Sequence, residues 1–355
     1  MDTSDGFFFS FDAPSEATAT TDVPTTQASC AVASLTTLPP ASRSTALFPW
    51  VALNDEIVSQ WASAYCTATK PCQLELEVPK AALVTSSSSS TAASSTTLND
   101  TLSFTLCYQT SPEVSALTSV TGPEAAASTE HRDVIPGRYY GGLKVWSCAT
   151  LLAEYLSAHA AQYHPLFHKS GTVAELGCGQ GLPGLAAICL GARRVAFQDY
   201  NEEVLAVCTK PNLAATVTAN RATLSGLHGS HRGTPALQVQ FVHGDWVDLK
   251  WESQDGTPTS SSSAEDAFCD VILGADVTFD KEACDKLACV LRRWLRPHTG
   301  EAIIASKDYY FGTNGGYLEF TRSAQSNGLQ VTLLQRVDTA DKMPHVVFRV
   351  THGSR

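Results

Sequence analysis

The sequence has little charge, and positive charge is the scarcer kind. Only 17% of its 355 residues are charged, and 24 lysines and arginines against 35 aspartates and glutamates give a formal net charge of −11. Proteins that bind a phosphate backbone usually carry a basic face. We therefore expect no direct nucleic-acid binding. An acidic surface favours a basic protein partner, although acidity that serves solubility alone explains the charge at least as well.

The sequence also lacks a long apolar run and a paired cysteine motif. No stretch approaches the roughly 20 apolar residues of a membrane span, and the phenylalanines at 7–9 are too few for a signal-peptide core. The eleven cysteines are odd in number, and none forms a CxxC pair. We therefore expect no metal site and reduced cysteines. These features predict a soluble protein of the cytoplasm and nucleus, with no membrane contact.

The first 130 residues are expected to form no domain of their own. Residues 1–45 are predicted to be a disordered N-terminal segment, because 12–45 are rich in Thr, Ser, Ala and Pro. The alternating phenylalanines at 7–11 fit either a disordered tip or a short strand or docking segment. Residues 46–130 are predicted to be an N-terminal extension, with a helix at 54–65, strands at 74–78 and 101–108, and a Ser-rich linker at 86–95.

From residue 131 to 355, strands and helices are predicted to alternate. The predicted strands are 172–176, 194–198, 239–242, 270–273 and 302–305, and the predicted helices are 146–160, 182–190, 202–220, 281–295 and 317–326. The helix at 202–220 should be disturbed at Pro211. This alternation predicts an α/β fold with a mostly parallel seven-strand sheet and helices on both faces. The last two strands, 330–335 and 345–350, should form an antiparallel hairpin at its edge. The Ser-rich insertions at 223–236 and 253–264 are expected to be surface loops.

A glycine-rich turn follows the first of these strands. The sequence Glu-Leu-Gly-Cys-Gly-Gln-Gly places Gly177, Gly179 and Gly181 between a predicted strand and a predicted helix. Such a turn lets the backbone approach a ligand closely and directs a helix N-terminus at it. The pattern alone would also suit a dinucleotide.

Three features favour S-adenosylmethionine over a dinucleotide. Glu175 precedes the turn, where an acid can receive the methionine ammonium group. Asp199 lies 22 residues after the first glycine, at the end of the next strand, which suits a carboxylate that binds both ribose hydroxyls. Gly244, Asp245 and Trp246 follow the strand after that and can bracket an adenine. The competing interpretations are a helix N-cap for Asp199, a turn residue for Asp245 and a core position for Trp246.

Several motifs together resemble the protein-histidine N-methyltransferases. That family belongs to the class I, seven-strand protein methyltransferases that modify lysine and histidine, which have a Rossmann-like fold. The resemblance covers about residues 131–350 and also the N-terminal phenylalanine segment. The motifs that carry it are Pro136-Gly137, Tyr140-Gly-Gly-Leu-Lys-Val-Trp146, the glycine turn, Gln198-Asp-Tyr-Asn201, and Ser306-Lys307 with Tyr310-Phe311-Gly312.

The resemblance implies S-adenosylmethionine as cofactor and a basic protein substrate, a large-subunit ribosomal protein, as partner. It places the following residues around the cofactor: Val145, Trp146, Ser147 and Cys148 at the methionine end, Glu175 and Gly177 under the methionine, Asp199, Tyr200 and Asn201 at the ribose, Gly244, Asp245 and Trp246 at the adenine, and Gly274 and Ala275 at the end of the fourth strand. Where related sequences often carry a tyrosine after that strand, this chain has Phe279. Any role for a hydroxyl group there is lost.

The chemistry of the reaction indicates one candidate catalytic residue. Neutral imidazole offers a lone pair near pH 7, and an acceptor at its other nitrogen stabilises the imidazolium that forms. Asp276, at the end of the fourth strand, is our candidate for this acceptor, and a helix cap or loop contact is an equally good explanation of it. Trp146 either shapes the acceptor channel or packs the first helix.

Other activities are less consistent with the sequence. No Asn/Asp-Pro-Pro-Tyr motif follows the fourth strand, so DNA and glutamine amide substrates are disfavoured. The alternatives that stay open are a protein-lysine N-methyltransferase with the same core and a non-catalytic S-adenosylmethionine-binding assembly factor. The second would predict loss of the glycine turn or of the ribose carboxylate, and both are intact.

Overall fold

The computed structural model describes residues 46–47, 49–63, 71–83, 100–109, 133–135, 137–169, 171–228, 237–249, 268–338 and 343–353. The predictions for residues 1–45, for the linker at 86–95 and for the insertion at 253–264 lie outside the described residues. Pro136 of the resemblance motif does so too.

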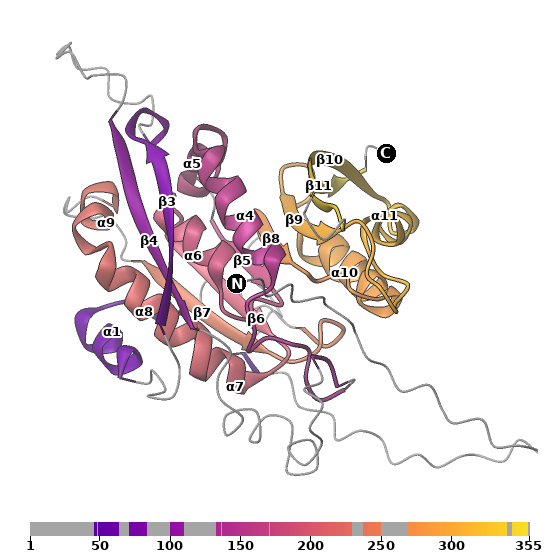
Figure 1. The fold of residues 1–355 in the computed structure, drawn as a ribbon, viewed down its shortest axis with the longest axis horizontal. Helices are drawn as coiled ribbons and strands as arrows, with labels where there is room; N and C mark the ends of the chain where they lie inside the picture. Colours follow the sequence, from indigo (N-terminus) through magenta and orange to yellow (C-terminus); the bar gives the residue numbers. More distant parts are fainter. Residues whose placement is uncertain are drawn as a thin grey trace, which may run out of the picture.

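A mostly parallel sheet organises the chain (Figure 1). Its main strands run in the order β7-β6-β5-β8-β9-β11-β10. The first five of these are mutually parallel, and β11 is antiparallel to both of its neighbours. The bounds are β5 Val173–Leu176, β6 Arg194–Asp199, β7 Gln238–His243, β8 Val271–Ala275, β9 Glu301–Lys307, β10 Leu329–Val337 and β11 His345–His352. The predicted seven-strand sheet with an antiparallel pair at its edge is therefore confirmed.

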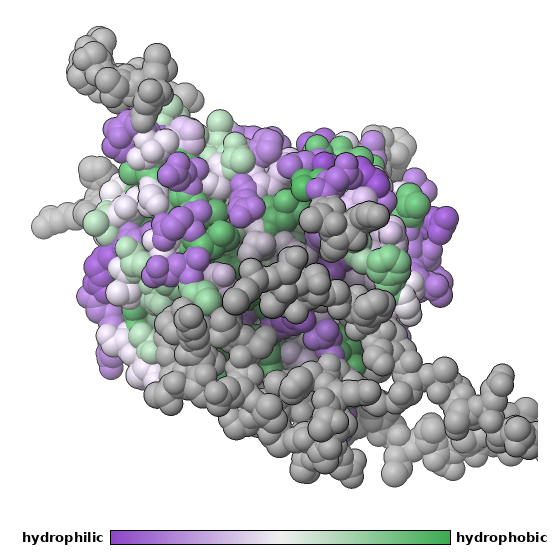
Figure 2. Space-filling view, in the orientation of Figure 1, coloured by the Kyte–Doolittle hydropathy of each residue, from purple (hydrophilic) through white to green (hydrophobic). Residues whose placement is uncertain are grey.

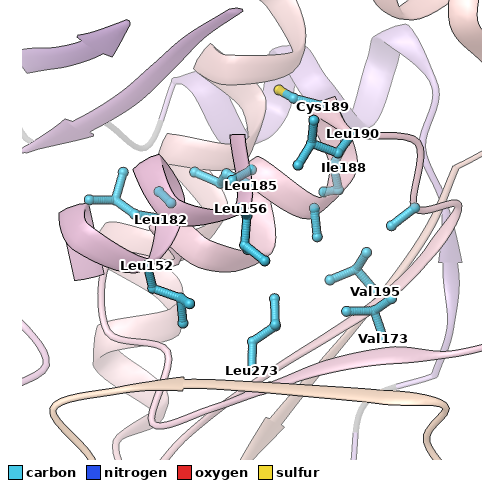
Figure 3. Close-up of a cluster of buried hydrophobic side chains, with 14 of the residues drawn as sticks. Leu152, Leu156, Val173, Leu182, Leu185, Ile188, Cys189, Leu190, Val195 and Leu273 are labelled. Atoms are coloured by element: carbon cyan, nitrogen blue, oxygen red, sulfur yellow. The ribbon is translucent and has the colours of Figure 1, made fainter. Parts of the chain in front are cut away.

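Helices cover both faces of this sheet, because its strands are apolar on both sides. Alternate residues enter different cores: Val173 and Ile303 join one buried cluster, and their chain neighbours Ala174 and Ile304 join the other. On one face lie α4 Ser147–Ala158, α5 Ala160–Lys169 and α6 Leu182–Cys189, and on the other α10 Lys281–Trp294 and α11 Tyr317–Ser326. Figure 3 shows Leu152 and Leu156 of α4 pointing toward the strand residue Leu273.

The N-terminal extension packs on the same body. Strands β1 Ala46–Leu47 and β2 Val51–Ala52 pair antiparallel with β7, and α1 Asp55–Ala62 contacts the helix α8 Lys210–Ala219. Strands β3 Pro71–Pro79 and β4 Thr101–Gln109 form a separate two-stranded sheet. The 3-10 turn η1 Lys80–Leu83 directly follows β3. Buried residues such as Phe104 and Leu106 of β4 belong to the core cluster that contains α4 and α6. Figure 2 shows hydrophilic residues over α1 and over the α10–α11 end of the molecule.

The predicted disturbance near Pro211 is present. The chain runs from α7 Glu202–Val204 through a wider π-helical segment, Leu205–Thr209 (labelled η2), into α8. Proline cannot donate a backbone hydrogen bond, and its ring crowds the carbonyl four residues earlier, which here belongs to Val207. That carbonyl accepts a hydrogen bond from Nε2 of Gln109 instead (2.9 Å).

Two helices were not predicted. The helix α5 continues beyond residue 160, where the prediction ended, and it contains Pro165, which weakens the pattern in the sequence. The helix α9 Arg221–His228 occupies the start of the segment that we expected to be a loop from residue 223. Its Leu224 is buried in the core, so the loop prediction was wrong there. None of the helices in the described ranges is long and apolar enough to cross a membrane.

Candidate cofactor and acceptor site

The glycine turn between β5 and α6 has a left-handed backbone. Gly177, Gly179 and Gly181 have φ angles of 60°, 50° and 83°, a region that side chains with a Cβ rarely adopt. A Cβ on Gly177 would also lie 2.8 Å from Val277, and one on Gly179 would lie 3.0 Å from the carbonyl oxygen of Gly142. The glycines are therefore required both by the conformation and by the close approach of neighbouring chain.

The acid before the turn is tied to the helix after it. Glu175 is buried at the end of β5, and its Oε2 accepts the backbone N–H of Gly184 in the first turn of α6 (2.8 Å). Burial raises the pKa of the Glu175 carboxyl well above its usual value. Because this side chain already occupies a helix N-terminal amide, that amide cannot also receive a pyrophosphate. This contact disfavours the dinucleotide interpretation.

A second carboxylate lies beside the turn, at the end of β6. Asp199 Oδ2 accepts the N–H of Gly179 (2.9 Å) and Oδ1 accepts the N–H of Asn201 (3.0 Å). Burial raises the pKa of Asp199 to about 6. The N-cap residue of α7 is Asn201 and not Asp199, so the helix-cap interpretation of Asp199 is wrong. Both carboxylates, Glu175 and Asp199, line one cavity.

Gln198 joins the turn to the end of β7. Its Oε1 accepts the N–H of Gly177 (3.1 Å) and the indole N–H of Trp246 (2.7 Å), and its Nε2 donates to the carbonyl of Gly244 (2.9 Å). The Trp246 side chain lines the cavity, and it also packs against the core cluster of α10. Both interpretations of Trp246 therefore have a structural basis.

Asp245, beside Trp246, forms an ion pair inside the cavity. Its Oδ2 accepts from Lys286 of α10 (2.7 Å), and its Oδ1 accepts the N–H of Val247 (3.0 Å). Burial of Lys286 works to lower its pKa, but the hydrogen bonds to Asp245 and Glu282 outweigh it and the pKa is raised. The bond to Val247 is the turn contact that we had considered, and the same carboxylate lines the cavity with Lys286.

Asp276 follows β8 and Tyr310 follows β9, and both line the cavity. Asp276 has a positive φ of 54°; its Oδ1 accepts the hydroxyl of Tyr310 (2.7 Å) and its Oδ2 the N–H of Cys148 at the start of α4 (3.0 Å). Burial raises the pKa of the Tyr310 phenol well above its usual value, so its hydroxyl stays a hydrogen-bond donor. Asp276 thus makes the helix contact that we had considered and also lines the cavity.

Aromatic rings also line this cavity. The Tyr140 ring lies 4.8 Å from that of Tyr200 and 6.0 Å from that of Phe279, measured between centroids. All three residues line the cavity, as does Trp146. The indole N–H of Trp146 donates to the carbonyl of Gly141 (2.9 Å), which fixes the ring at the cavity wall.

A segment that we call the strap (residues 137–146) crosses the glycine turn. Tyr200 donates from its hydroxyl to the carbonyl of Gly137 (2.9 Å), and Asn201 donates from Nδ2 to the carbonyl of Arg138 (2.7 Å). Gln180 of the turn donates to the carbonyl of Leu143 (2.8 Å). The side chain of Asn201 is therefore directed to the strap.

Most of the predicted site residues share one cavity. Those that line it are Val145, Trp146, Glu175, Gly177, Gly179, Asp199, Tyr200, Gly244, Asp245, Trp246, Ala275 and Asp276. Those that do not line it are Ser147, Cys148, Gly181, Asn201 and Gly274.

Several of these five residues contact residues that line the cavity or that pack beside it. Ser147 Oγ is hydrogen-bonded to Nε2 of His345 in β11 (2.7 Å), and Cys148 donates its backbone N–H to Asp276. A Cβ on Gly274 would lie 2.9 Å from Val277. The prediction did not include Gln180, Lys286 and Tyr310, which do line the cavity, nor Gln198.

The residues of the cavity fit S-adenosylmethionine. Asp199, at the end of β6, can accept two ribose hydroxyls. Trp246 and Asp245, after β7, can flank an adenine. The glycine turn has no side chains at Gly177 and Gly179 that would block the approach of a ligand to its backbone. The strand order, with its antiparallel last pair, is that of the class I methyltransferases.

Comparison with known proteins gives the same assignment. Residues 138–241 match the lysine methyltransferase family. A histidine protein methyltransferase 1 homolog of Dictyostelium discoideum is 32% identical over 53% of this chain and 50% of that protein. The homolog of Bos taurus is 29% identical over 59% of this chain and 55% of that protein.

A relative with a different acceptor also matches. A protein-lysine N-methyltransferase of Homo sapiens is 32% identical over 43% of this chain and 40% of that protein. The chain spans about half the length of the two histidine methyltransferase relatives. The chain is therefore similar both to proteins named for a histidine acceptor and to one named for a lysine acceptor.

Proposed function

We propose that this chain is a protein-histidine N-methyltransferase that uses S-adenosylmethionine to methylate a histidine of a large-subunit ribosomal protein. The observation that carries the proposal is the position of Asp276, an anionic acceptor that lines the same cavity as Glu175 and Asp199. The histidine methyltransferase relatives support the acceptor type. The net charge of −11 suits a basic substrate.

The chain's own residues would bind the cofactor and orient the acceptor. Bound S-adenosylmethionine would supply an electrophilic methyl group on its sulfonium. Asp199 would accept the ribose hydroxyls, and Trp246 would contact the adenine. Because these groups come from strand ends in one sheet, they hold the cofactor's position without large movements, which lowers the entropic cost of reaction.

Asp276 would set the tautomer of the incoming histidine. A carboxylate has about four lone-pair sites, and Asp276 directs some of them to Tyr310 and to Cys148. The remaining sites can accept the N–H of the imidazole, so the other ring nitrogen presents its lone pair. As that nitrogen is methylated, the carboxylate stabilises the positive charge that forms on the ring.

The test identifies the acceptor directly. The full chain is incubated with isotope-labelled S-adenosylmethionine and purified large-subunit ribosomal proteins, and the modified residue is located by peptide fragmentation. We expect methyl-histidine, with turnover strongly reduced in Asp276→Asn and cofactor affinity retained. Methyl-lysine without methyl-histidine would reject the proposal, and full turnover in Asp276→Asn would reject the role of this side chain.

A protein-lysine N-methyltransferase is the second candidate, because the matched family and one relative are described by that activity. The two candidates differ in pH dependence. Lysine with a pKa near 10.4 must lose a proton first, whereas histidine with a pKa near 6.5 is mostly neutral at pH 7. A rate that levels off above about pH 7 favours histidine, and one that keeps rising favours lysine.

We also propose the cytoplasm and nucleus as the compartments. None of the described cysteines is in a disulfide, as suits a reducing environment. Microscopy of a fluorescent fusion tests this, and a secreted fusion protein would contradict it.

A further inference from the structure

The outer edge of β4 is paired with side chains instead of with another strand. The N–H of Thr105 donates to Oδ1 of Asn220 (2.9 Å), whose Nδ2 donates back to the carbonyl of Thr105 (2.8 Å). Two residues on, the N–H of Cys107 donates to Oγ1 of Thr216 (2.9 Å). An exposed strand edge would be prone to pair with other chains, and these side chains cover it.

The spacing of the two elements explains why this pairing works. Asn212, Thr216 and Asn220 are four residues apart, so they lie on one face of α8 with about 6 Å of helix between them. Alternate residues of a strand are separated by about 6.5 Å. The polar side chains of α8 therefore stay in step with the N–H groups of β4.

The last step of this series reaches the glycine turn. The N–H of Gln109 donates to Oε1 of Gln180 (3.1 Å), and Nε2 of Gln109 lies within hydrogen-bond distance of the carbonyl of Val207 (2.9 Å) and of Oδ1 of Asn212 (3.3 Å). Asn212 in turn donates from Nδ2 to Oε1 and to the carbonyl oxygen of Gln180 (2.7 and 3.0 Å). Gln109, Asn212 and Gln180 are all buried.

Gln180 connects this network to the cavity. It lies between Gly179 and Gly181 and lines the cavity, and its Nε2 donates to the carbonyl of Leu143 in the strap. With Oε1 held by Gln109 and Asn212, the amide of Gln180 has a single orientation in which Nε2 faces the strap. The turn and the strap that crosses it are thus fixed from one side by β4 and α8.

We propose that Gln109 is a positioning residue for the cofactor turn. It lies in the N-terminal extension and does not line the cavity. Its backbone N–H donates to Gln180, and its side-chain amide contacts Asn212, which also donates to Gln180. Its amide also donates to the carbonyl of Val207, to which Pro211 has no N–H to offer. The extension therefore sets the conformation of the cofactor site, in addition to covering the core. This inference rests on the proposed cofactor.

The test compares two variants along the same edge of β4 in the full chain. Gln109→Leu keeps the approximate volume and the backbone N–H that donates to Gln180, and it removes the side-chain amide that contacts Val207 and Asn212. Thr216→Val is a matched control that removes the partner of Cys107 from the same seam. Affinity for S-adenosylmethionine is measured by calorimetry well below both unfolding temperatures. Hydrogen exchange of the peptide that covers residues 175–181 is measured without cofactor.

We expect Gln109→Leu to bind the cofactor about tenfold more weakly and to exchange faster in the turn, with Thr216→Val like the parent in both measurements. Equal effects of the two variants, or no effect of Gln109→Leu, would overturn the proposal. If Gln109→Leu fails to fold, Gln109→Glu keeps the shape of the side chain and removes the Nε2 donor to Val207 and Asn212, and the same outcomes decide. A parent protein that does not bind S-adenosylmethionine would reject the proposed function, and the exchange measurement would still decide the positioning role.

Discussion

The hydroxyl of Tyr310 donates to Oδ1 of Asp276 at 2.7 Å, from a buried position on the cavity wall. The second oxygen of that carboxylate is held by the N-terminus of α4. A side chain held at both oxygens keeps one orientation, as a group that must meet an incoming substrate requires.

Tyr310→Phe should therefore lower turnover and leave cofactor binding unchanged. Loss of a hydrogen bond to a charged group costs about 1.5–3 kcal/mol, which corresponds to at least about a tenfold fall in kcat. The control is Tyr309→Phe, because Tyr309 is exposed. Steady-state kinetics and calorimetry measure the two quantities, and an unchanged kcat in Tyr310→Phe would contradict the prediction.

Asp199→Ala should weaken the affinity for S-adenosylmethionine. Two hydrogen bonds from ribose hydroxyls to a carboxylate would be lost, at a cost of about 1.5–3 kcal/mol, or about tenfold or more in Kd. Asp248→Asn, at an exposed position outside the cavity, is the control. Calorimetry on the folded variants measures the affinities, and equal affinities would reject the ribose assignment.

Cofactor affinity should fall as the pH drops below about 6. Burial raises the pKa of Asp199 from 3.8 to about 6 in the cofactor-free protein, so the carboxyl binds a proton in the mildly acidic range and loses acceptor capacity. The contribution of the Asp199 carboxyl to the stability of the fold has the opposite pH dependence. This contribution is fully present below pH 3.8 and is lost as the pH rises through about 6. Calorimetry at about pH 5 and about pH 7.5 measures the change. In Asp199→Asn we expect weak binding that this titration no longer affects, and pH-independent affinity in the parent would contradict the prediction.

Gly184→Ala should destabilise the fold. An added Cβ would lie 2.4 Å from Cε1 of Phe197 and 2.7 Å from Oε2 of Glu175, and overpacking of this kind costs about 1–3 kcal/mol. Gly226→Ala is the matched control, because nothing lies within 4 Å of its added Cβ and alanine stabilises a helix interior by about 0.5–1 kcal/mol relative to glycine. Denaturant unfolding measures both variants. Equal stabilities would show that the packing around Glu175 can relax.

The sequence predicts those parts of the fold and site that depend on local pattern. Apolar runs such as 302–305 identify buried parallel strands, and the carboxyl ends of such strands meet at one edge. Asp199 and Asp276 could therefore be placed at the cavity from their positions after strands. The glycines of the turn, which have a left-handed backbone, could also be recognised from the sequence, because they are closely spaced directly after a predicted strand.

The contacts that hold the site in place have no such signature. Gln109 reaches Gln180 across 71 positions of the chain, and an amide in a strand looks the same in the sequence whether or not it has a buried partner. Cys148 acts through its backbone N–H, which its residue type does not reveal. Tyr310 was visible only as part of a motif, and its partner follows from the tertiary structure.

The position of β11 has a consequence for the order in which the protein assembles during synthesis. β11 is made after β10, yet it lies between β9 and β10 in the sheet, so β10 has no place in the sheet until β11 has been translated and inserted. The first residue of β11, His345, is hydrogen-bonded to Ser147 at the start of α4, next to the helix N-terminus that holds Asp276. A nascent chain that ends before residue 345 therefore has its glycine turn but lacks this support for α4, so cofactor binding and catalytic competence should arise at different stages of translation.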